Sequence, residues 1–196
     1  MQLNPTEQKI YQRVKEVLAD EPVASVDHVE RMVTWSQKLS QGLEPDPEVL
    51  VAGALVHDIG VVLDRPKHFE AGIPLAREVL REAGLSEDKI EPALHVMQAH
   101  SRYGGPEPQT LEAKIGQDAD ALEYLGAIGV VRLVVRGLKD GSFDGKISKF
   151  PDFMRSIIAK VDDTFHTEKA EELGRERLEF MRRFNERIEQ EIKGEV

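Results

Sequence analysis

Apolar side chains recur at intervals of three and four residues along most of this chain, and clean alternation of apolar and polar residues is scarce. Positions three and four apart share one face of an α-helix, whereas a half-buried strand alternates with a period of two. The spacing therefore predicts an all-α fold. We expect helices over about residues 7–18, 25–42, 47–59, 68–83, 86–100, 110–138 (with a break near Gly126 or Gly129), 150–161 and 168–192.

Residue types that favour helix ends support several of these boundaries. Thr6, Asp46 and Thr167 each precede a helical pattern and are expected to cap the N-terminus of that helix. Pro47 suits the first helical position, where a backbone N–H has no partner inside the helix. Gly60 is expected to end the helix that begins at Pro47.

Length and charge limit the kind of protein this is. A chain of 196 residues without a long low-complexity linker is expected to form a single domain over residues 1–196. Its formal net charge of -10 argues against coating nucleic acid or lying on an anionic membrane. The N-terminal residues lack a signal pattern and no apolar stretch is long enough to span a bilayer. We expect a soluble, cytoplasmic protein.

The pair His57-Asp58 follows the apolar run at residues 50–56 and precedes Ile59. A histidine and an aspartate on a segment suited to a protein interior would cost several kcal/mol in desolvation unless a partner compensates them. A metal ion is the expected partner. Because the chain has no cysteine, any metal must be held by imidazole and carboxylate groups.

Two other segments offer groups that complete such a site. His28 falls on the same helical face as Met32 and Trp35, which directs it inward. Asp118 and Asp120 are two residues apart on a predicted helix, so only one of them easily faces a given site. Together with His57-Asp58 they would give two imidazoles and two carboxylates, a set that suits Mn²⁺, Fe²⁺, Mg²⁺, Co²⁺, Ni²⁺ or Zn²⁺.

The order of these segments resembles a known signature. Residues 27–31 read Asp-His-Val-Glu-Arg, His57-Asp58 follows, and residues 119–122 read Ala-Asp-Ala-Leu. In that order they are similar to the H…HD…D signature of the HD superfamily of metal-dependent phosphohydrolases. The similarity extends to the small bacterial and archaeal HD-domain proteins that include nucleotide pyrophosphohydrolases, and it covers about residues 23–185.

The resemblance implies an HD-domain bundle of helices around a metal site, flanked by an N-terminal helix and a long C-terminal helix. Its implied ligands are His28, His57, Asp58 and Asp120, and Asp120 is preferred to Asp118 because the family's carboxylate occupies the second position of Ala-Asp-x-Leu. The implied activity is hydrolysis of a phosphate ester or anhydride of a nucleotide by a metal-activated water, with Mn²⁺ as the favoured ion.

Catalytic roles follow from the same resemblance. HD triphosphohydrolases make His68 a candidate general acid toward the leaving phosphate, although a histidine at a helix start is also a common structural feature. Asp118, or alternatively Asp64, is a candidate base toward the attacking water.

Four further residues are candidates for substrate binding. Arg65 and Lys67 would neutralise phosphate oxygens, although cations in loops are usually just solvated. Arg31 lies three residues after His28 and therefore flanks the same helical face. His100 precedes a glycine-rich loop, the kind of segment that carries substrate contacts.

Three alternatives stay open. His68 and His100 allow a second metal, as in binuclear HD phosphodiesterases and related di-iron oxygenases, but the chain lacks their Gly-Tyr-Pro-type motif and one metal is favoured. The protein is alternatively a sensor that binds metal or nucleotide without turnover. It is alternatively a helical scaffold that forms a homodimer through an apolar stripe on its last helix. That stripe consists of Leu173, Phe180, Met181, Phe184, Ile188 and Ile192.

Overall fold

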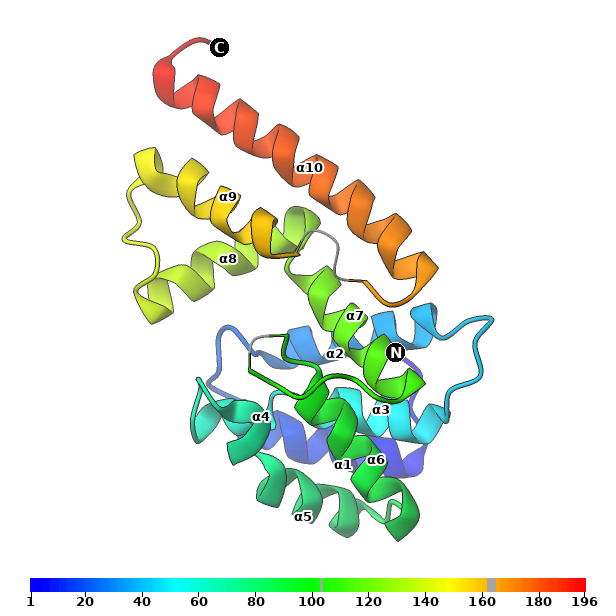
Figure 1. Ribbon diagram of the computed structural model, residues 1–196. Coiled ribbons are helices and arrows are strands. Elements are labelled where there is room, and N and C mark those ends of the chain that lie inside the picture. The colour runs from blue at the N-terminus through cyan, green and yellow to red at the C-terminus, as the bar shows by residue number, and fades with distance from the viewer. Residues whose placement is uncertain (103, 162–164) are drawn as a thin grey trace. The chain divides into compact units, whose positions relative to one another are not determined.

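In the computed structural model, residues 1–102, 104–161 and 165–196 are described, and every regular element among them is a helix (Figure 1). This confirms the predicted all-α fold. The chain divides into two compact units, residues 1–120 and residues 121–196. That the whole chain forms a single HD domain stays a prediction. In the described part of the chain, none of the helices has the length and apolar composition needed to cross a membrane.

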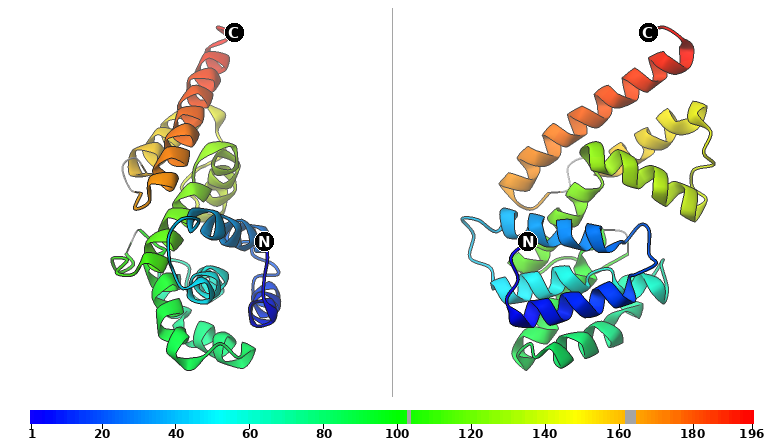
Figure 2. Two further views of the ribbon diagram at one scale, coloured as in Figure 1. Left: turned by 90° about the vertical axis from the view of Figure 1, so that its right-hand side faces the viewer. Right: turned by 180° about the vertical axis from the view of Figure 1, so that it is seen from behind.

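The first unit is built around one buried helix, α3, which contacts α1, α2 and α6 (Figures 1 and 2). Residues 49–56 of α3 are all buried, as expected for a helix that is apolar on every side. The elements of this part of the chain are α1 (Pro5–Val17), α2 (Val26–Leu39), α3 (Pro47–Val56), the 3₁₀ helix η1 (Ile59–Val62), α4 (His68–Ala71), α5 (Ile73–Ala83), α6 (Glu87–Ala99) and α7 (Leu111–Glu123), whose last residues belong to the second unit.

Helix α3 approaches α6 closely because position 53 is a glycine. A Cβ atom on Gly53 would lie 2.5 Å from Cβ of Val96 and 2.8 Å from the carbonyl oxygen of Ala93. Only a residue without a side chain therefore allows this packing. The close contact holds the end of α3 that carries His57-Asp58 against the helix that leads to His100.

The predicted caps are partly right. Asp46 accepts from the N–H groups of Glu48 (3.0 Å) and Val49 (3.3 Å) and caps α3, as predicted. Thr167 caps α10 (Glu168–Lys193), also as predicted. Thr6, however, lies inside α1. The cap of that helix is Asn4, which forms a reciprocal capping box with Glu7 and leaves no role for the Thr6 hydroxyl there.

Asp46→Ala is expected to lower the free energy of unfolding by about 1 kcal/mol, because two backbone N–H groups at the start of α3 lose their acceptor. Asp46→Asn should retain most of the stability, because an amide oxygen still caps the helix and the ion pair with Lys89 (2.9 Å) is partly exposed. Urea unfolding of both variants measures the difference. Equal losses in the two variants would contradict the capping role.

The pH dependence of this contribution follows from the pKa of Asp46. Burial raises the pKa of the carboxyl, but hydrogen bonds from Lys89 and from the N–H of Val49 outweigh burial, and the pKa is lowered overall. The stabilisation by the carboxylate is therefore present above the unfolded pKa of about 3.9 and is lost as the pH falls through the lower folded value.

The predicted helix over residues 68–83 is two helices, α4 and α5, divided at Gly72. The physical reason is Pro74, which has no N–H to continue the hydrogen bonding of α4 and occupies the first turn of α5. Residues 60–62, between the predicted helices at 47–59 and 68–83, lie inside η1. The break predicted in the long helix is confirmed, since α7 ends at Glu123 and Gly126 adopts a φ of 71°.

The second unit has its own apolar core. It contains α8 (Gly126–Asp140), the 3₁₀ helix η2 (Ile147–Lys149), α9 (Phe150–Val161) and α10 (Glu168–Lys193). Along the predicted stripe of α10, Met181 is buried, whereas Phe180 and Ile192 are 38% and 42% exposed. The core residues are Leu125, Val130, Leu133, Phe143, Phe150, Met154, Ile158, Leu178 and Met181.

Candidate metal centre

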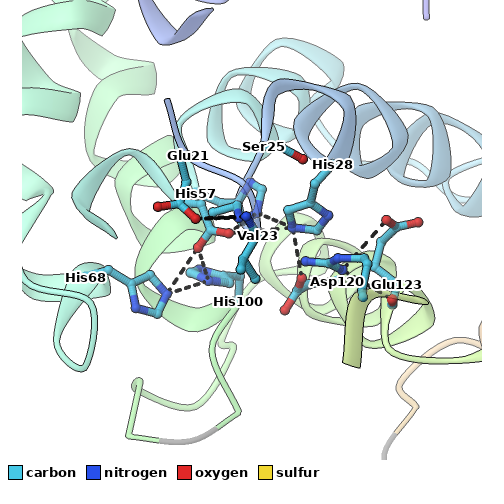
Figure 3. A network of polar contacts seen from close by, with 12 residues as sticks. Glu21, Val23, Ser25, His28, His57, His68, His100, Asp120 and Glu123 are labelled. Atoms are coloured by element: carbon cyan, nitrogen blue, oxygen red, sulfur yellow. Dashed lines mark hydrogen bonds and ion pairs between the residues drawn. The ribbon is translucent and has the colours of Figure 1, made fainter. Parts of the chain in front are cut away.

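His28 is fully buried near the start of α2, one turn after its N-cap Ser25. Its Nε2 atom lies 3.1 Å from Nε2 of His57 and 3.4 Å from Oδ1 of Asp120, so residues from α2, the end of α3 and α7 meet there (Figure 3). His28, His57 and Asp120 each offer one ligand atom within 4.8 Å of the others.

A second group of donors lies beside the first. Asp58, His68 and His100 also offer ligand atoms that lie within 4.8 Å of one another. His68 and His100 come from α4 and from the end of α6, and their Nε2 atoms are 3.1 Å apart (Figure 3). All four predicted metal ligands are therefore brought together, and His68 and His100 join them.

Asp58 connects the two groups. Its Oδ2 atom lies 3.3 Å from Nε2 of His57 and 3.6 Å from Nε2 of His28. Its Oδ1 atom lies 3.3 Å from Nε2 of His68 and 3.5 Å from Nε2 of His100. Each carboxylate oxygen thus faces a different pair of imidazoles, a placement suited to a carboxylate that bridges two cations.

The two carboxylates are ionised despite burial. Burial raises the pKa of Asp58, but the charge of His57 and hydrogen bonds from His100 and His28 outweigh it and hold the pKa well below its usual range. Burial likewise raises the pKa of Asp120, and the hydrogen bond from His28 and the charge of His100 lower it further than burial raises it. Both groups are therefore anionic at neutral pH.

Three of the histidines are oriented by the same backbone contact. Nδ1 of His57 lies 2.8 Å from the carbonyl oxygen of Ala54, and Nδ1 of His68 lies 2.9 Å from that of Arg65. Nδ1 of His100 contacts the carbonyl oxygen of Met97 in the same way, again three residues earlier. Since a carbonyl oxygen only accepts, each Nδ1 carries a proton, and each Nε2 faces the centre, where its unprotonated form can bind a metal ion.

The spacing of these Nε2 atoms tests whether a cation fits. The Nε2 atoms of His68 and His100 lie 3.1 Å apart, and both face the anionic Oδ1 of Asp58. Acceptors at this separation repel one another unless a proton or a metal ion lies among them. Imidazole and carboxylate donors suit Mn²⁺, Fe²⁺, Co²⁺, Ni²⁺ and Zn²⁺, so the residues fit a divalent ion.

Asp118 lies outside both donor groups. Its side chain is fully buried, and its Oδ1 atom lies 3.3 Å from Nη2 of Arg102. The spacing of two residues on α7 accounts for this, because Asp118 and Asp120 point in different directions. Arg102 was not identified as this partner from the sequence, and its position two residues after His100 was the only available signal.

The predicted substrate-binding cations lie near carboxylates or in solvent. Arg31 pairs with Asp27 (2.5 Å) one turn earlier on α2. Arg65 pairs with Glu21 (2.5 Å), while Lys67 is exposed at the start of α4. A substrate phosphate would compete with a carboxylate for either arginine.

Two residues that support the site carry no obvious sequence signal. Gln117 donates its Nε2–H to the carbonyl oxygen of Ala99 (2.6 Å) and so holds the end of α6 beside His100. Gly60 was expected to end a helix, but it lies inside η1 and does not have the positive φ of a glycine cap. A Cβ atom there would overlap the carbonyl oxygen of His68 and lie 2.7 Å from the backbone nitrogen of Gly72.

This geometry agrees with the comparison to known proteins. A family model described as the HD domain matches residues 26–125, about half of the chain and all six donor residues. The chain belongs to the HD domain family. This HD domain protein is 28% identical over 188 residues to YpgQ of Bacillus subtilis (strain 168), covering 92% of this chain and 91% of YpgQ.

Solved structures of other HD domain proteins share the fold. The crystal structure of Bacillus subtilis YpgQ in complex with ADP has a TM-score of 0.75 at 22% identity, covering 95% of this chain and 94% of that one. A crystal structure of an HD-superfamily hydrolase from Bacillus thuringiensis has a TM-score of 0.73 at 25% identity, covering 95% and 96%. This HD domain protein is therefore a small, YpgQ-like member of the family.

Proposed function

We propose that this HD domain protein is a metal-dependent phosphohydrolase that cleaves a phosphate ester or anhydride of a nucleotide. The observation that carries the proposal is Asp58, whose two oxygens face two pairs of imidazoles, all buried except the part-buried His68. Buried imidazole and carboxylate donors in this number are typical of hydrolytic sites that use divalent ions. The ADP bound to YpgQ supports a nucleotide as the substrate.

In the first candidate arrangement one ion is held by His28, His57, Asp58 and Asp120. We favour Mn²⁺, and Mg²⁺, Fe²⁺, Co²⁺, Ni²⁺ and Zn²⁺ suit the same donors. When bound, a divalent ion supplies positive charge to phosphoryl oxygens and lowers the pKa of a water molecule. In this arrangement His68, in the form protonated at both ring nitrogens, would donate its Nε2 proton to the leaving phosphate, because its Nδ1–H is hydrogen-bonded to the carbonyl oxygen of Arg65.

A second candidate arrangement has two ions, with Asp58, His68 and His100 holding the second. It is favoured by the short distance of 3.1 Å between the Nε2 atoms of His68 and His100, both of which face Asp58. It is also favoured because burial lowers the pKa of His68 more than the charge of Asp58 raises it, which leaves the imidazole neutral at pH 7. A neutral imidazole is better suited to bind a metal ion than to donate a proton.

The remaining roles belong to the same proposal. Arg31, Arg65, Lys67 and, in the one-ion arrangement, His100 would bind the phosphorylated substrate. The carboxylate of Asp118, which pairs with Arg102, would accept the proton of the attacking water. We also retain the expected cytoplasmic location and the expected homodimer, which cell fractionation and light scattering would test.

Turnover by metal-loaded protein tests the proposal directly. The protein is stripped of metal, refilled with each of the six divalent ions, and incubated with nucleoside mono-, di- and triphosphates and with cyclic nucleotides. We expect release of phosphate or pyrophosphate that depends on the added ion. Counting bound metal per chain then distinguishes one ion from two.

The controls separate catalysis from binding. His57→Ala should abolish turnover, whereas His95→Ala should retain it, because His95 accepts from the N–H of Gln109 (3.0 Å) outside both donor groups. Binding of ADP without turnover by any loaded form would replace the proposal with the sensor alternative. Unchanged turnover in His57→Ala would refute the site itself.

A further inference from the structure

Glu21 is a largely buried carboxylate that belongs to neither donor group. It follows α1 on the turn that leads to α2, and its side chain is 7% exposed. Figure 3 shows Glu21 in the polar network around the centre, joined by a dashed line to Val23. Since burial of a carboxylate is costly unless it is compensated, its partners indicate what it does there.

The first set of partners belongs to the turn itself. Oε1 of Glu21 accepts hydrogen bonds from the N–H groups of Val23 (2.9 Å) and Ala24 (3.3 Å). These two residues directly precede Ser25, the N-cap of α2, and His28 lies one turn into that helix. One carboxylate oxygen of Glu21 therefore shapes the chain that enters the helix of the first metal-binding histidine.

The second partner is Arg65, which lies 44 residues further along the chain. Nη2 of Arg65 lies 2.5 Å from Oε2 of Glu21, and the arginine side chain is 33% exposed. The neighbouring residues Asp64, Pro66 and Lys67 are all exposed, so the loop has few buried contacts of its own. The ion pair with Glu21 thus connects this loop to the buried turn before α2.

The backbone of Arg65 touches the centre. Its carbonyl oxygen accepts the Nδ1–H of His68 (2.9 Å), and this bond directs Nε2 of His68 toward Oδ1 of Asp58 (3.3 Å). Helix α4, which begins at His68, has only four residues and no side-chain cap. The orientation of His68 therefore depends on where the Arg65 carbonyl is held.

We propose that Glu21 is a positioning residue for His68. By holding the guanidinium of Arg65 it fixes the Arg65 carbonyl, and that carbonyl in turn fixes the tautomer and the ring orientation of His68. This inference rests on the proposed phosphohydrolase function only for its kinetic consequence. Its structural consequence is measurable in the metal-free protein.

Glu21→Gln is the informative variant, because the amide oxygen still accepts from Val23 and Ala24 while the charge that holds Arg65 is lost. In the metal-loaded protein we expect kcat to fall about tenfold, as for other residues that orient a metal-site imidazole. KM should stay the same or fall, because the substrate contacts are retained and Arg65 no longer pairs with a carboxylate that competes with substrate phosphate. Glu16→Gln, whose carboxylate is exposed in a pair with Arg13, is the matched control and should leave both values unchanged.

Nitrogen-15 NMR of the imidazoles provides a readout that does not depend on turnover. In the metal-free wild type, His68 should show a protonated Nδ1, and in Glu21→Gln its signals should shift toward those of a histidine that exchanges between tautomers. Arg65→Ala should reproduce the shift. The double variant with Glu21→Gln and Arg65→Ala should show no larger shift than Arg65→Ala alone, because both changes act through the ion pair between these two residues.

The outcomes separate this inference from the proposed function. A changed His68 spectrum in a protein without turnover supports the positioning role and refutes the hydrolase. An unchanged spectrum in Glu21→Gln and in Arg65→Ala refutes the positioning role whatever the activity. If Glu21→Gln fails to fold, Arg65→Ala decides alone, because it leaves the contacts of Glu21 with the turn in place.

Discussion

Asp58→Ala is expected to reduce bound metal to near zero and to lower turnover by at least about 100-fold. Loss of a residue that only orients a metal ligand already lowers metal affinity or activity by about 10- to 100-fold. Both donor groups lose a member at once, since each oxygen of Asp58 faces a different pair of imidazoles. Among the donor residues described, Asp58 alone has this double placement, so its loss should exceed the loss from His100→Ala.

The effect on stability provides an independent measurement. A metal at 100 times its Kd stabilises a folded protein by about 2.7 kcal/mol, and the melting temperature of the wild type should rise accordingly on addition of Mn²⁺. Asp58→Ala should show no such rise. Asp88→Asn, a change of an exposed carboxylate in the first turn of α6, is the control and should melt like the wild type with and without metal. Retained metal in Asp58→Ala would contradict the role of Asp58 as a metal ligand.

Gly60→Ala is expected to be the most damaging change of a single methyl group in the first unit. The new Cβ would overlap the carbonyl oxygen of His68 and lie 2.7 Å from the nitrogen and 2.8 Å from Cα of Gly72. These are backbone atoms, which cannot rotate away as a side chain can. We expect α4 to be displaced, with a loss of up to about 3 kcal/mol of stability, typical of overpacking, and a loss of activity in the fraction that stays folded.

Two other changes distinguish overlap from ordinary perturbation. At Gly84 an added Cβ would have free space, but the backbone has a φ of +89°. Gly84→Ala therefore measures backbone strain alone and should lower the free energy of unfolding by about 1 kcal/mol. Val62→Ala truncates an exposed side chain of the same 3₁₀ helix and should change little. If Gly60→Ala unfolds at the same urea concentration as Gly84→Ala and retains full activity, the close contact between η1 and α4 does not position His68.

The helices could be predicted because their signals are local. Apolar spacing sets α1, α2 and α6 within a few residues, and the caps at Asp46 and Thr167 act on N–H groups two or three positions away. The division between α4 and α5 was missed although Pro74 was visible, because the apolar pattern continues across it. The exposure of Phe180 could not be predicted, because apolar spacing shows which residues share a helix face but not which other element covers that face.

The centre itself was predictable in part for a different reason. His28, the pair His57-Asp58 and Asp120 follow an order that resembles a known signature, and the structure brings these residues together. The contacts that position them are not visible in such a pattern. Glu21 and Arg65 are far apart in the chain, and no periodicity connects them. Gly60 resembles a helix stop in the sequence, and only the folded chain shows that its importance is close approach.

The backbone contacts of His57, His68 and His100 would affect how the proposed centre binds an ion. Each ring is fixed by a carbonyl oxygen three residues earlier, so the entropy of ordering these ligands is lost during folding rather than during metal binding. The centre is preorganised, in contrast to a zinc finger, whose ligands come together only around the metal. If the centre binds an ion as proposed, loading and release are therefore expected to leave the fold of the chain in place.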